Sequence, residues 1–316
     1  MKITVVIPVY CEGENVDQIY GEVARVFERD LPQHELEVLF CDNASEDDSF
    51  ERVQRICARD RRVRGVRLSR NFGYQANILT GYANAMGDAV VQIDADGEDP
   101  PDLIPEFVKR WEQGCQVVYG IRTVRREPRW LVWQRKLFYR LLRRISSVEI
   151  PPDAGDFRLL DRAVVETLCR RFGEHNPYLR GLVSFIGFQQ VGIPYERRPR
   201  ARGRSKFSYL RYLSLAWDGI TSFSRVPLKL VSALGFLMSF FALIGILAYL
   251  VKFALGLIPV RGFTTLVLLL LLLSGIQLLS LGILGEYLGR IFDEVKARPR
   301  AIVERHCGFE SEPRSP

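Results

Sequence analysis

Two long apolar stretches near the C-terminal end constrain this chain more than any other feature of its sequence. Residues 230–251 and 263–285 contain no charged side chain. Each stretch exceeds the roughly 20 residues that an α-helix needs to cross the hydrocarbon core of a bilayer. The short connection between them holds Gly256, Pro259 and Gly262. The pattern predicts a membrane hairpin of two helices.

Charged residues beside these stretches predict the orientation of the hairpin. Membrane proteins keep most basic residues on the cytoplasmic side. The connection holds only Lys252 and Arg261, whereas more basic residues flank the hairpin: Arg225, Lys229, Arg290, Lys296, Arg298 and Arg300. Both ends of the hairpin are therefore expected in the cytoplasm. Glycines within the two spans let helices approach closely, so we also expect self-association.

The N-terminal end opens with an apolar run that is too short for a secretory signal peptide. Residues 1–8 read MKITVVIP, which suits a buried strand better than a cleaved signal. We therefore expect the first part of the chain to stay in the cytoplasm. The six cysteines form no CxxC pair, and no His lies near them at metal-site spacing. We expect them to be free thiols in a reducing compartment.

Strand-like and helix-like segments alternate along the first part of the chain. Short β-branched runs predict strands over residues 3–9, 36–41, 63–68, 89–93 and 117–119. Helical spacing predicts helices over residues 14–29, 74–86 and 103–111. A further helix is predicted to begin with a cap at residues 42–45 and to end at about residue 57. Such alternation is typical of a parallel, doubly wound sheet. Ligands of these sheets bind beyond the carboxyl ends of the strands.

The chain is basic, with a formal net charge of +7, and the excess lies in two clusters, over residues 122–144 and 197–211. Each cluster alone is compatible with a solvated face. Their place beside the apolar stretches favours anionic lipid or phosphate over nucleic acid as the partner. Residues 121–150 also have an apolar side, with Trp130 and Trp133. This side either packs on the folded domain or lies in the bilayer interface.

Two carboxylates follow the fourth predicted strand. Asp94 and Asp96 lie one residue apart on the turn that leaves this buried strand, where both can contact one divalent cation. Mg²⁺ and Mn²⁺ bind carboxylate and phosphate oxygens together, and a leaving diphosphate needs its charge neutralised. The same spacing also occurs on solvated turns. Asp99 is expected to cap the next helix, and the role of Glu98 is open.

Other polar residues follow the first two strands. Tyr10 can cover the face of a base, and Glu12 can accept a hydrogen bond from a ribose or a base; Pro8 either lines the same pocket or only ends its strand. Asp42 can accept from a base N–H or cap the next helix together with Ser45.

Two further segments carry charged groups of a kind that acts on phosphates. Asp156 could deprotonate or orient an acceptor, or it could simply pair with an arginine. Residues 200–206 read RARGRSK, a basic loop that could bind phosphate oxygens through Arg202 and Lys206. Contact with lipid headgroups is the alternative for this loop.

Several segments resemble glycosyltransferase family 2, in the branch that acts on polyprenyl phosphates. In chain order they are VVIPVYCEGENV, FCDNASEDDS, LSRNFGYQANILTGYANAMGD, VQIDADGEDPPDLI, GDFRLLDR and RPRARGRSKFS. They cover nearly the whole chain. This branch includes bactoprenol glucosyltransferases, undecaprenyl-phosphate aminoarabinose transferase and dolichyl-phosphate mannose synthases.

The resemblance implies a Rossmann-like GT-A fold and transfer with inversion at the anomeric carbon. It implies a UDP-activated hexose as donor, glucose by preference, and undecaprenyl phosphate as acceptor at the cytoplasmic face of the inner membrane. UDP-aminoarabinose and GDP-mannose are the alternative donors. A non-catalytic membrane scaffold is the alternative of a different class. A homo-oligomer, with a tetramer as one form, is also implied.

The resemblance assigns roles to particular residues. The nucleotide-sugar pocket is implied at Pro8, Tyr10, Glu12, Asp42, Asp94 and Arg122. The metal ligand, for Mg²⁺ or Mn²⁺, is implied at Asp96 with Asp94 nearby. The acceptor carboxylate corresponds to Asp156, and Arg122, Arg202 and Lys206 correspond to positions near the phosphates. The family usually reads DADLQDPP, whereas residues 94–101 here read DADGEDPP, which bears on the donor sugar more than on the reaction class.

These expectations divide the chain into four parts. Residues 1–207 are expected to form a cytoplasmic GT-A catalytic domain, and residues 208–229 an amphipathic juxtamembrane segment. Residues 230–303 are expected to hold the two membrane helices, at about 230–253 and 263–286, and a cytoplasmic segment. Residues 304–316 are expected to form a disordered polar tail.

Overall fold

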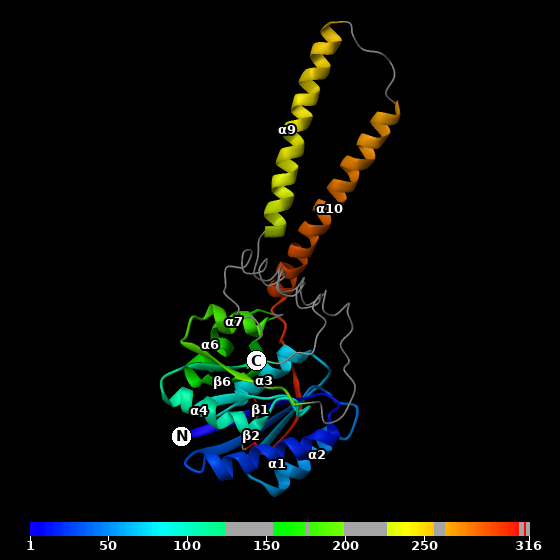
Figure 1. Ribbon diagram of the computed structural model, residues 1–316. Helices are drawn as coiled ribbons and strands as arrows, with labels where there is room; N and C mark the ends of the chain where they lie inside the picture. Colours follow the sequence, from blue (N-terminus) through cyan, green and yellow to red (C-terminus); the bar gives the residue numbers. More distant parts are fainter. Residues whose placement is uncertain (124–153, 175–176, 199–225, 256–262, 310–312, 314–316) are drawn as a thin grey trace. The chain divides into compact units, whose positions relative to one another are not determined.

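The computed structural model describes residues 1–123, 154–174, 177–198, 226–255, 263–309 and 313. These residues form two compact units (Figure 1). The helical unit holds the two long helices α9 and α10. The α/β unit holds all the other helices and strands, and it includes the chain that follows α10, from Ala297 onward.

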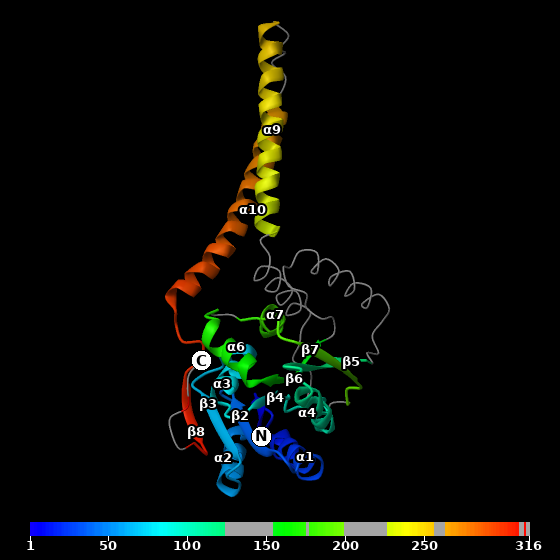
Figure 2. The same ribbon diagram turned by 90° about the vertical axis from the view of Figure 1, so that its left-hand side faces the viewer.

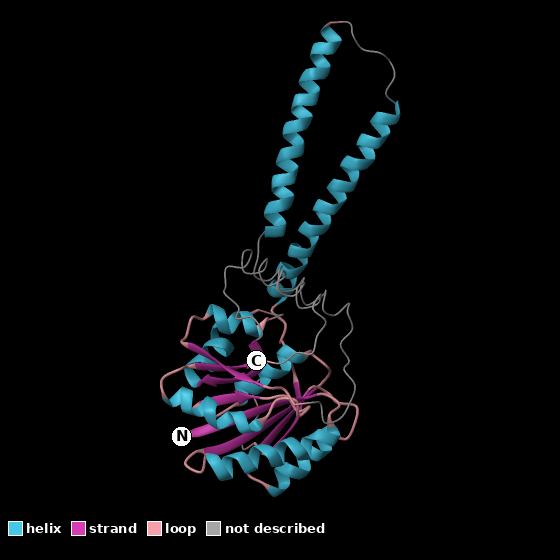
Figure 3. Ribbon diagram, viewed as in Figure 1, coloured by secondary structure: helices cyan, strands magenta, loops and turns pink. Residues whose placement is uncertain are grey.

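The centre of the α/β unit is a group of four parallel strands, in the order β4-β1-β2-β3. They are β1 (Lys2–Val9), β2 (Glu35–Asp42), β3 (Val63–Leu68) and β4 (Ala89–Gln92). Nearly every residue of these strands is buried, because helices cover both faces of the sheet (Figure 3). This is why they read as continuous apolar runs. Four of the five predicted strands are thereby confirmed.

The sheet as a whole is mixed: the five predicted strands run parallel to one another, as expected, and strands that were not predicted join them. β6 (Ala154–Asp161) lies antiparallel between β4 and β5 (Val117–Arg122). β7 (Gln190–Tyr195) is parallel to β5, and β8 (Val303–Cys307) is antiparallel to β3. Apolar runs report burial but not strand direction, so the sequence pattern could not reveal the antiparallel half.

Helices lie on the two faces of this sheet (Figures 1 and 2). One face carries α1 (Gly13–Asp30), α2 (Ser49–Arg59) and α4 (Ile104–Glu112), the last preceded by a 3₁₀ turn, η1 (Pro101–Leu103). The other face carries α3 (Tyr74–Asn84), α6 (Arg162–Arg171) and α7 (Leu179–Phe185). The arrangement is an α/β fold of three layers, as a GT-A resemblance implies.

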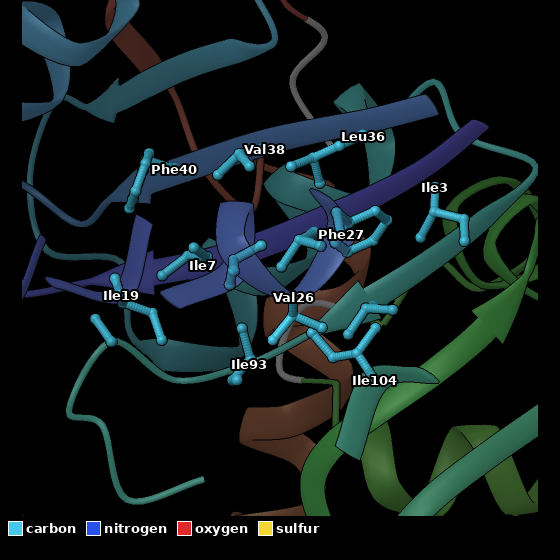
Figure 4. Close-up of a cluster of buried hydrophobic side chains, with 14 of the residues drawn as sticks. Ile3, Ile7, Ile19, Val26, Phe27, Leu36, Val38, Phe40, Ile93 and Ile104 are labelled. Carbon is cyan, nitrogen blue, oxygen red and sulfur yellow. The ribbon is translucent and has the colours of Figure 1, made fainter. Parts of the chain in front are cut away.

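A cluster of buried side chains fixes α1 and α4 against the sheet (Figure 4). Ile19 and Phe27 of α1 are at most 3% exposed, and they pack with Ile3 and Ile7 of β1. Full burial of each such side chain stabilises the fold by about 1.5–3 kcal/mol. The cluster therefore holds the strand ends, and the loops that follow them, in fixed positions.

The predicted start of the second helix is wrong. We expected a cap at residues 42–45, whereas α2 begins at Ser49 after Asp48. The carboxylate of Asp42 instead accepts the backbone N–H of Ser45, at 3.2–3.3 Å, and Ala44 has a φ of 58°. The intervening residues form a turn, so Asp42 remains the last residue of β2.

The helical unit consists of α9 (Val226–Ala254) and α10 (Phe263–Lys296), which contact each other. Both predicted spans fall on these helices. Within the described residues, Leu272–Lys296 of α10 is long and apolar enough to cross a membrane, judged by length and composition, and the apolar stretch Val231–Gly245 of α9 is shorter. Ile121 and Arg122 end β5, but residues 124–150, and 208–225 of the juxtamembrane segment, lie outside the described residues.

The predicted polar tail contains a strand. β8 pairs with β3 at the edge of the sheet (Figure 2), and Ala301, which precedes it, is fully buried beside Leu68 and Ala76. The strand reads VERHC, and its three central side chains are exposed. An edge strand of this kind lacks an apolar run, which is why the sequence pattern predicted disorder.

Candidate functional site at the carboxyl ends of β1, β2 and β4

Three loops meet where the parallel strands end. Val9 of β1 lies beside Asp42 of β2 in the ladder, and β4 ends one strand further along. The backbone N–H of Asn43 donates to the carbonyl of Val9 at 2.9 Å, and that of Cys11 donates to the hydroxyl of Ser45 at 2.9 Å. The loops after β1 and β2 are therefore joined to each other. Their geometry does not depend on a ligand.

The residues predicted to bind the nucleotide lie in these loops and strand ends. Tyr10 is 38% exposed, and Glu12 is half-buried and accepts from the amide of Asn15 at 2.6 Å. Pro8 is buried inside β1 opposite Cys41, and β1 continues to Val9, so Pro8 does not end the strand.

Asp42 lies beneath the surface at the end of β2. It is fully buried, and its Oδ2 lies 3.5 Å from Nη1 of Arg67. Burial raises the pKa of Asp42, and the bonds from Ser45 and the charge of Arg67 oppose that shift. The side chain is thus held in one orientation by its own loop.

A chain of hydrogen bonds leads from the core to Asp94. The hydroxyl of Tyr82 donates to Oε1 of Gln92 at 2.5 Å, and Nε2 of Gln92 donates to the hydroxyl oxygen of Tyr74 at 3.3 Å. The hydroxyl of Tyr74 then donates to Oδ1 of Asp94 at 2.6 Å. Each group has a single consistent direction of donation, so the chain orients the Asp94 carboxylate. Sequence reasoning missed Tyr74; the only signal was a tyrosine directly after Gly73, at the start of a helix.

Gly81 lets the helix that carries Tyr74 approach the sheet closely. A Cβ at this position would lie 2.4 Å from Cγ1 of Val6 and 2.9 Å from Sγ of Cys41. Any larger side chain would push α3 away from β1 and β2. The position of the Tyr74 hydroxyl therefore depends on a glycine two turns further along the same helix.

The surroundings of Asp94 disfavour the ionised form of its carboxyl group. Burial, followed by the charges of Asp99 and Asp156, raises the pKa of Asp94 to about 7, although the bond from Tyr74 opposes the shift. Asp96 adds to the repulsion. A positive charge placed here would favour the ionised form.

The carboxylates Asp94 and Asp96 fit a cation that arrives with phosphate oxygens. Within the described residues, no three His, Cys, Asp or Glu side chains gather closely enough to hold a metal ion by themselves. Mg²⁺ commonly binds through one or two carboxylates together with substrate phosphates and water. The pair is therefore suited to a metal–diphosphate complex rather than to a resident ion.

Arg197 lies among the other acidic residues of the same loop. Its guanidinium contacts Glu98 as an ion pair, lies 3.4 Å from Oδ1 of Asp99, and lies 3.9 Å from Oδ2 of Asp96. Glu98, whose role the sequence left open, is thus an ion-pair partner of Arg197. One arginine from the residues after β7 neutralises part of the acidic loop.

The prediction that Asp99 caps a helix is wrong. Asp99 is fully buried, and its Oδ1 accepts the hydroxyl of Tyr195 at 2.5 Å. Nη2 of Arg122 lies 3.8 Å from Oδ2 of Asp99, and Nε of Arg122 donates to the Tyr195 hydroxyl at 3.3 Å. Arg122 was predicted to lie near phosphates, and in this structure it contacts the loop that follows β4. The local pattern could not predict partners that lie almost a hundred residues away.

Asp156 is paired with two arginines, as the structural alternative predicted. Its carboxylate accepts from Nε and Nη2 of Arg180 at 2.9 and 2.5 Å, and from Nη2 of Arg158 at 2.7 Å. Burial alone would raise the pKa of Asp156, but Arg180, Arg158 and Arg122 hold it well below its ordinary value. A carboxylate so strongly ionised is a weak base. Arg202 and Lys206 lie outside the described residues.

Comparison with known proteins places the chain among enzymes that transfer sugars. The family described as Glycosyl transferase family 2 matches residues 4–169. The uncharacterized glycosyltransferase YkcC of Bacillus subtilis is 42% identical over 314 residues, which are 98% of this chain and 96% of that protein. The SfII prophage-derived bactoprenol glucosyl transferase of Shigella flexneri is 37% identical over 309 residues, 96% of this chain and 98% of that protein.

One solved structure shows the same kind of similarity at greater distance. It is the mannosyltransferase PcManGT of Pyrobaculum calidifontis, in complex with GDP-Man and Mn²⁺. The two are 18% identical with a TM-score of 0.47, over 70% of this chain and 63% of that chain.

Proposed function

Because this chain belongs to glycosyl transferase family 2, we propose that it moves a hexose from a nucleoside diphosphate sugar to a polyprenyl phosphate. The observation that carries this proposal is similarity over nearly the whole chain to proteins named bactoprenol glucosyl transferase, at 36–37% identity. We propose UDP-glucose as the donor and undecaprenyl phosphate as the acceptor. Other donors, including UDP-aminoarabinose and GDP-mannose, are outcomes that the test below distinguishes.

The donor is proposed to bind at the carboxyl ends of β1, β2 and β4. Tyr10 and Glu12 lie in the exposed part of this edge and would contact the base or ribose, with Asp42 beneath them. Asp94 and Asp96 would hold Mg²⁺ or Mn²⁺ together with the diphosphate. When bound, the cation neutralises the negative charge of the leaving diphosphate. The hydrogen bond from Tyr74 would hold the Asp94 carboxylate in the orientation that this binding requires.

The acceptor is proposed to bind beside Asp156. A lipid phosphate is already an anion near neutral pH, so the attacking oxygen needs no strong base. Asp156 is ionised and paired with Arg180 and Arg158, which supports a positioning role rather than proton removal. The side chain of Arg180 is more exposed than that of Arg158. Arg180 is therefore the arginine that would bind an incoming phosphate. Arg202 and Lys206 are assigned to the phosphates by the family resemblance alone.

The helical unit is proposed to hold the enzyme in the inner membrane. The long apolar segment of α10 and the exposed apolar side chains of α9, such as Phe236 and Leu243, support a two-helix hairpin. Basic residues on both outer flanks support a cytoplasmic α/β unit. A homo-oligomer formed through the glycine-containing helices is part of the same proposal.

The proposal is tested by sugar transfer to lipid. Membranes containing the full chain are incubated with undecaprenyl phosphate, Mn²⁺ and one radiolabelled nucleotide sugar at a time, and the lipid is then extracted. We expect label in the lipid fraction with UDP-glucose and none with Asp96→Asn. Label from another donor would correct the sugar, whereas no label from any donor, despite nucleotide binding, would favour the scaffold alternative.

A further inference from the structure

Two cysteines from distant parts of the sequence meet at the edge of the α/β unit. Cys57 lies on α2 and Cys307 on β8, 250 residues apart in sequence, and their Sγ atoms are 2.7 Å apart. Two thiols that merely pack together are separated by more than this. Both cysteines are half-buried, so a small reagent can reach them. All six cysteines are free thiols in this structure, as expected, and these two lie in contact.

The sheet is built so that the two sulfur atoms face each other. Cys307 is the ladder partner of Gly65 on β3, and α2 covers the same strand. A Cβ at Gly65 would lie 2.9 Å from Sγ of Cys307 and 2.5 Å from Cγ1 of Val53. A side chain on β3 would therefore separate the thiols. The glycine leaves the space in which they meet.

The chain around Cys307 is held in place by several other contacts. Ala301 is fully buried beside Leu68, and the backbone N–H of Ser69 donates to the carbonyl of Ile302 at 2.9 Å. The Arg64 guanidinium lies 4.7 Å from the centre of the Phe309 ring. Contacts before and after Cys307 thus hold its backbone beside α2.

We propose that Cys57 and Cys307 form a reversible disulfide that fastens β8 to α2. The oxidant is a low-molecular-weight disulfide of the glutathione type. One protein thiolate attacks a sulfur of this disulfide, forming a mixed disulfide and releasing one small thiol. The second cysteine then attacks the mixed disulfide, forming the Cys57–Cys307 bond and releasing the second small thiol. Two protein thiols are oxidised, and one small disulfide is reduced to two thiols.

The contact between the two sulfur atoms serves either order of attack. One S–H can donate to the other sulfur. The thiolate is the attacking species, and whichever cysteine attacks first, the other lies close enough to resolve the mixed disulfide.

The bond would act on the point where the chain returns to the α/β unit after α10. An edge strand with exposed polar side chains opens more readily than the central strands. Cross-linking β8 to α2 removes that opening, because the strand can no longer leave the edge of the sheet. Oxidation is therefore expected to stabilise the C-terminal end of the chain, and reduction to release it.

Peptide mapping tests whether the bond forms. The purified full chain in detergent is treated with oxidised glutathione, alkylated, digested and examined by mass spectrometry. We expect one peptide pair joined through Cys57 and Cys307, lost on treatment with dithiothreitol. In Cys57→Ser, Cys307 should instead retain glutathione. The control Cys115→Ser, which alters a half-buried thiol elsewhere, should keep the cross-link. Full alkylation of both cysteines while Cys115 becomes glutathionylated would overturn the proposal.

Hydrogen exchange tests what the bond does. We expect amide exchange over residues 303–307 to be at least tenfold slower in the oxidised wild type than in the reduced protein. Cys57→Ser, which cannot form the cross-link, should lack this slowing after the same treatment. If the cross-linked and reduced forms exchange at the same rate in this segment, the disulfide does not fasten β8 and that part of the inference is wrong.

Discussion

The hydroxyl of Tyr74 donates a 2.6 Å hydrogen bond to Oδ1 of Asp94. Tyr74 is the first residue of α3, and Asp94 lies two residues beyond the end of β4, so this bond connects a helix start to the metal-binding turn that we propose. Tyr74 is in turn held by Gln92. The orientation of the carboxylate is therefore decided by the packing of α3 on the sheet.

Removal of this hydroxyl should weaken the binding of a metal–nucleotide complex without unfolding the protein. In Tyr74→Phe the ring stays and the hydrogen bond is lost, which corresponds to about 1–2 kcal/mol, or about 5- to 30-fold in affinity. Calorimetry with UDP and Mn²⁺ measures the change. The matched control is Tyr20→Phe, which removes a 2.5 Å bond to Asp60 remote from the site. Equal losses in both variants would contradict the assignment.

Replacement of Asp94 by Asn should stabilise the metal-free protein while it abolishes metal-dependent nucleotide binding. The pKa of Asp94 is raised to about 7 in the folded state, above its value of about 4 in the unfolded chain. Between these two values the folded state holds a proton that the unfolded state has lost, so stability falls as the pH rises. Asn does not titrate, so the variant does not lose stability in this pH range.

Thermal unfolding at several pH values checks this expectation. The gain from Asp94→Asn should be roughly 1–3 kcal/mol at pH 8 and should shrink toward zero at pH 4. The Tyr74 hydroxyl can still donate to the amide oxygen of Asn, so that bond is kept. If Asp94→Asn is less stable than wild type at pH 8, the surroundings of Asp94 do not disfavour its ionised form, and the expectation is wrong.

Asp156→Asn should have the opposite effect on stability. The pKa of Asp156 is held well below its ordinary value, so its ion pairs stabilise the fold above about pH 4 and are lost only as the pH falls through the lower, folded-state value. Removing one partner of a buried ion pair typically costs about 3–5 kcal/mol. The variant should therefore melt well below wild type at pH 7.

The pH dependence of activity separates positioning from base catalysis at Asp156. A carboxylate ionised throughout the working range contributes no acid limb between pH 5 and pH 8. The pH dependence of the rate of lipid glycosylation should therefore have the same shape in wild type and in Asp156→Asn. The KM for the lipid phosphate should be higher in the variant. Loss of an ionisation in this range, with an unchanged KM, would identify Asp156 as a base instead.

Arg197→Gln should increase the affinity of the nucleotide-free protein for Mn²⁺. The guanidinium of Arg197 lies among Asp96, Glu98 and Asp99, where it competes with a cation for the same carboxylates. We expect a several-fold tighter binding of Mn²⁺ alone, measured by calorimetry or by the relaxation of water protons. The control is Arg198→Gln, because Arg198 pairs with Glu22 and Asp102 outside this cluster. Tighter binding in the control as well would point to net charge as the cause.

Local sequence patterns were enough to predict the central parallel strands, most of their helices and the position of Asp94 and Asp96 after β4. These features depend on local patterns. Apolar runs indicate buried strands and 3.6-residue spacing indicates helices, and each pattern lies within a short stretch of consecutive residues. The two apolar stretches were equally evident, and each lies in a helix. The family resemblance also came from short segments that can be read one at a time.

The partners of the site residues, by contrast, follow from how the chain folds in three dimensions. Asp99 contacts Tyr195, Asp156 contacts Arg180, and Cys57 meets Cys307, all through strands or helices that the sheet brings together. The antiparallel direction of β6 and the pairing of β8 with β3 are likewise set by contacts between distant parts of the chain. Such pairings arise from long-range packing, which no local periodicity encodes. They set the charge and pKa of the site, so its chemistry could not be derived from the motifs alone.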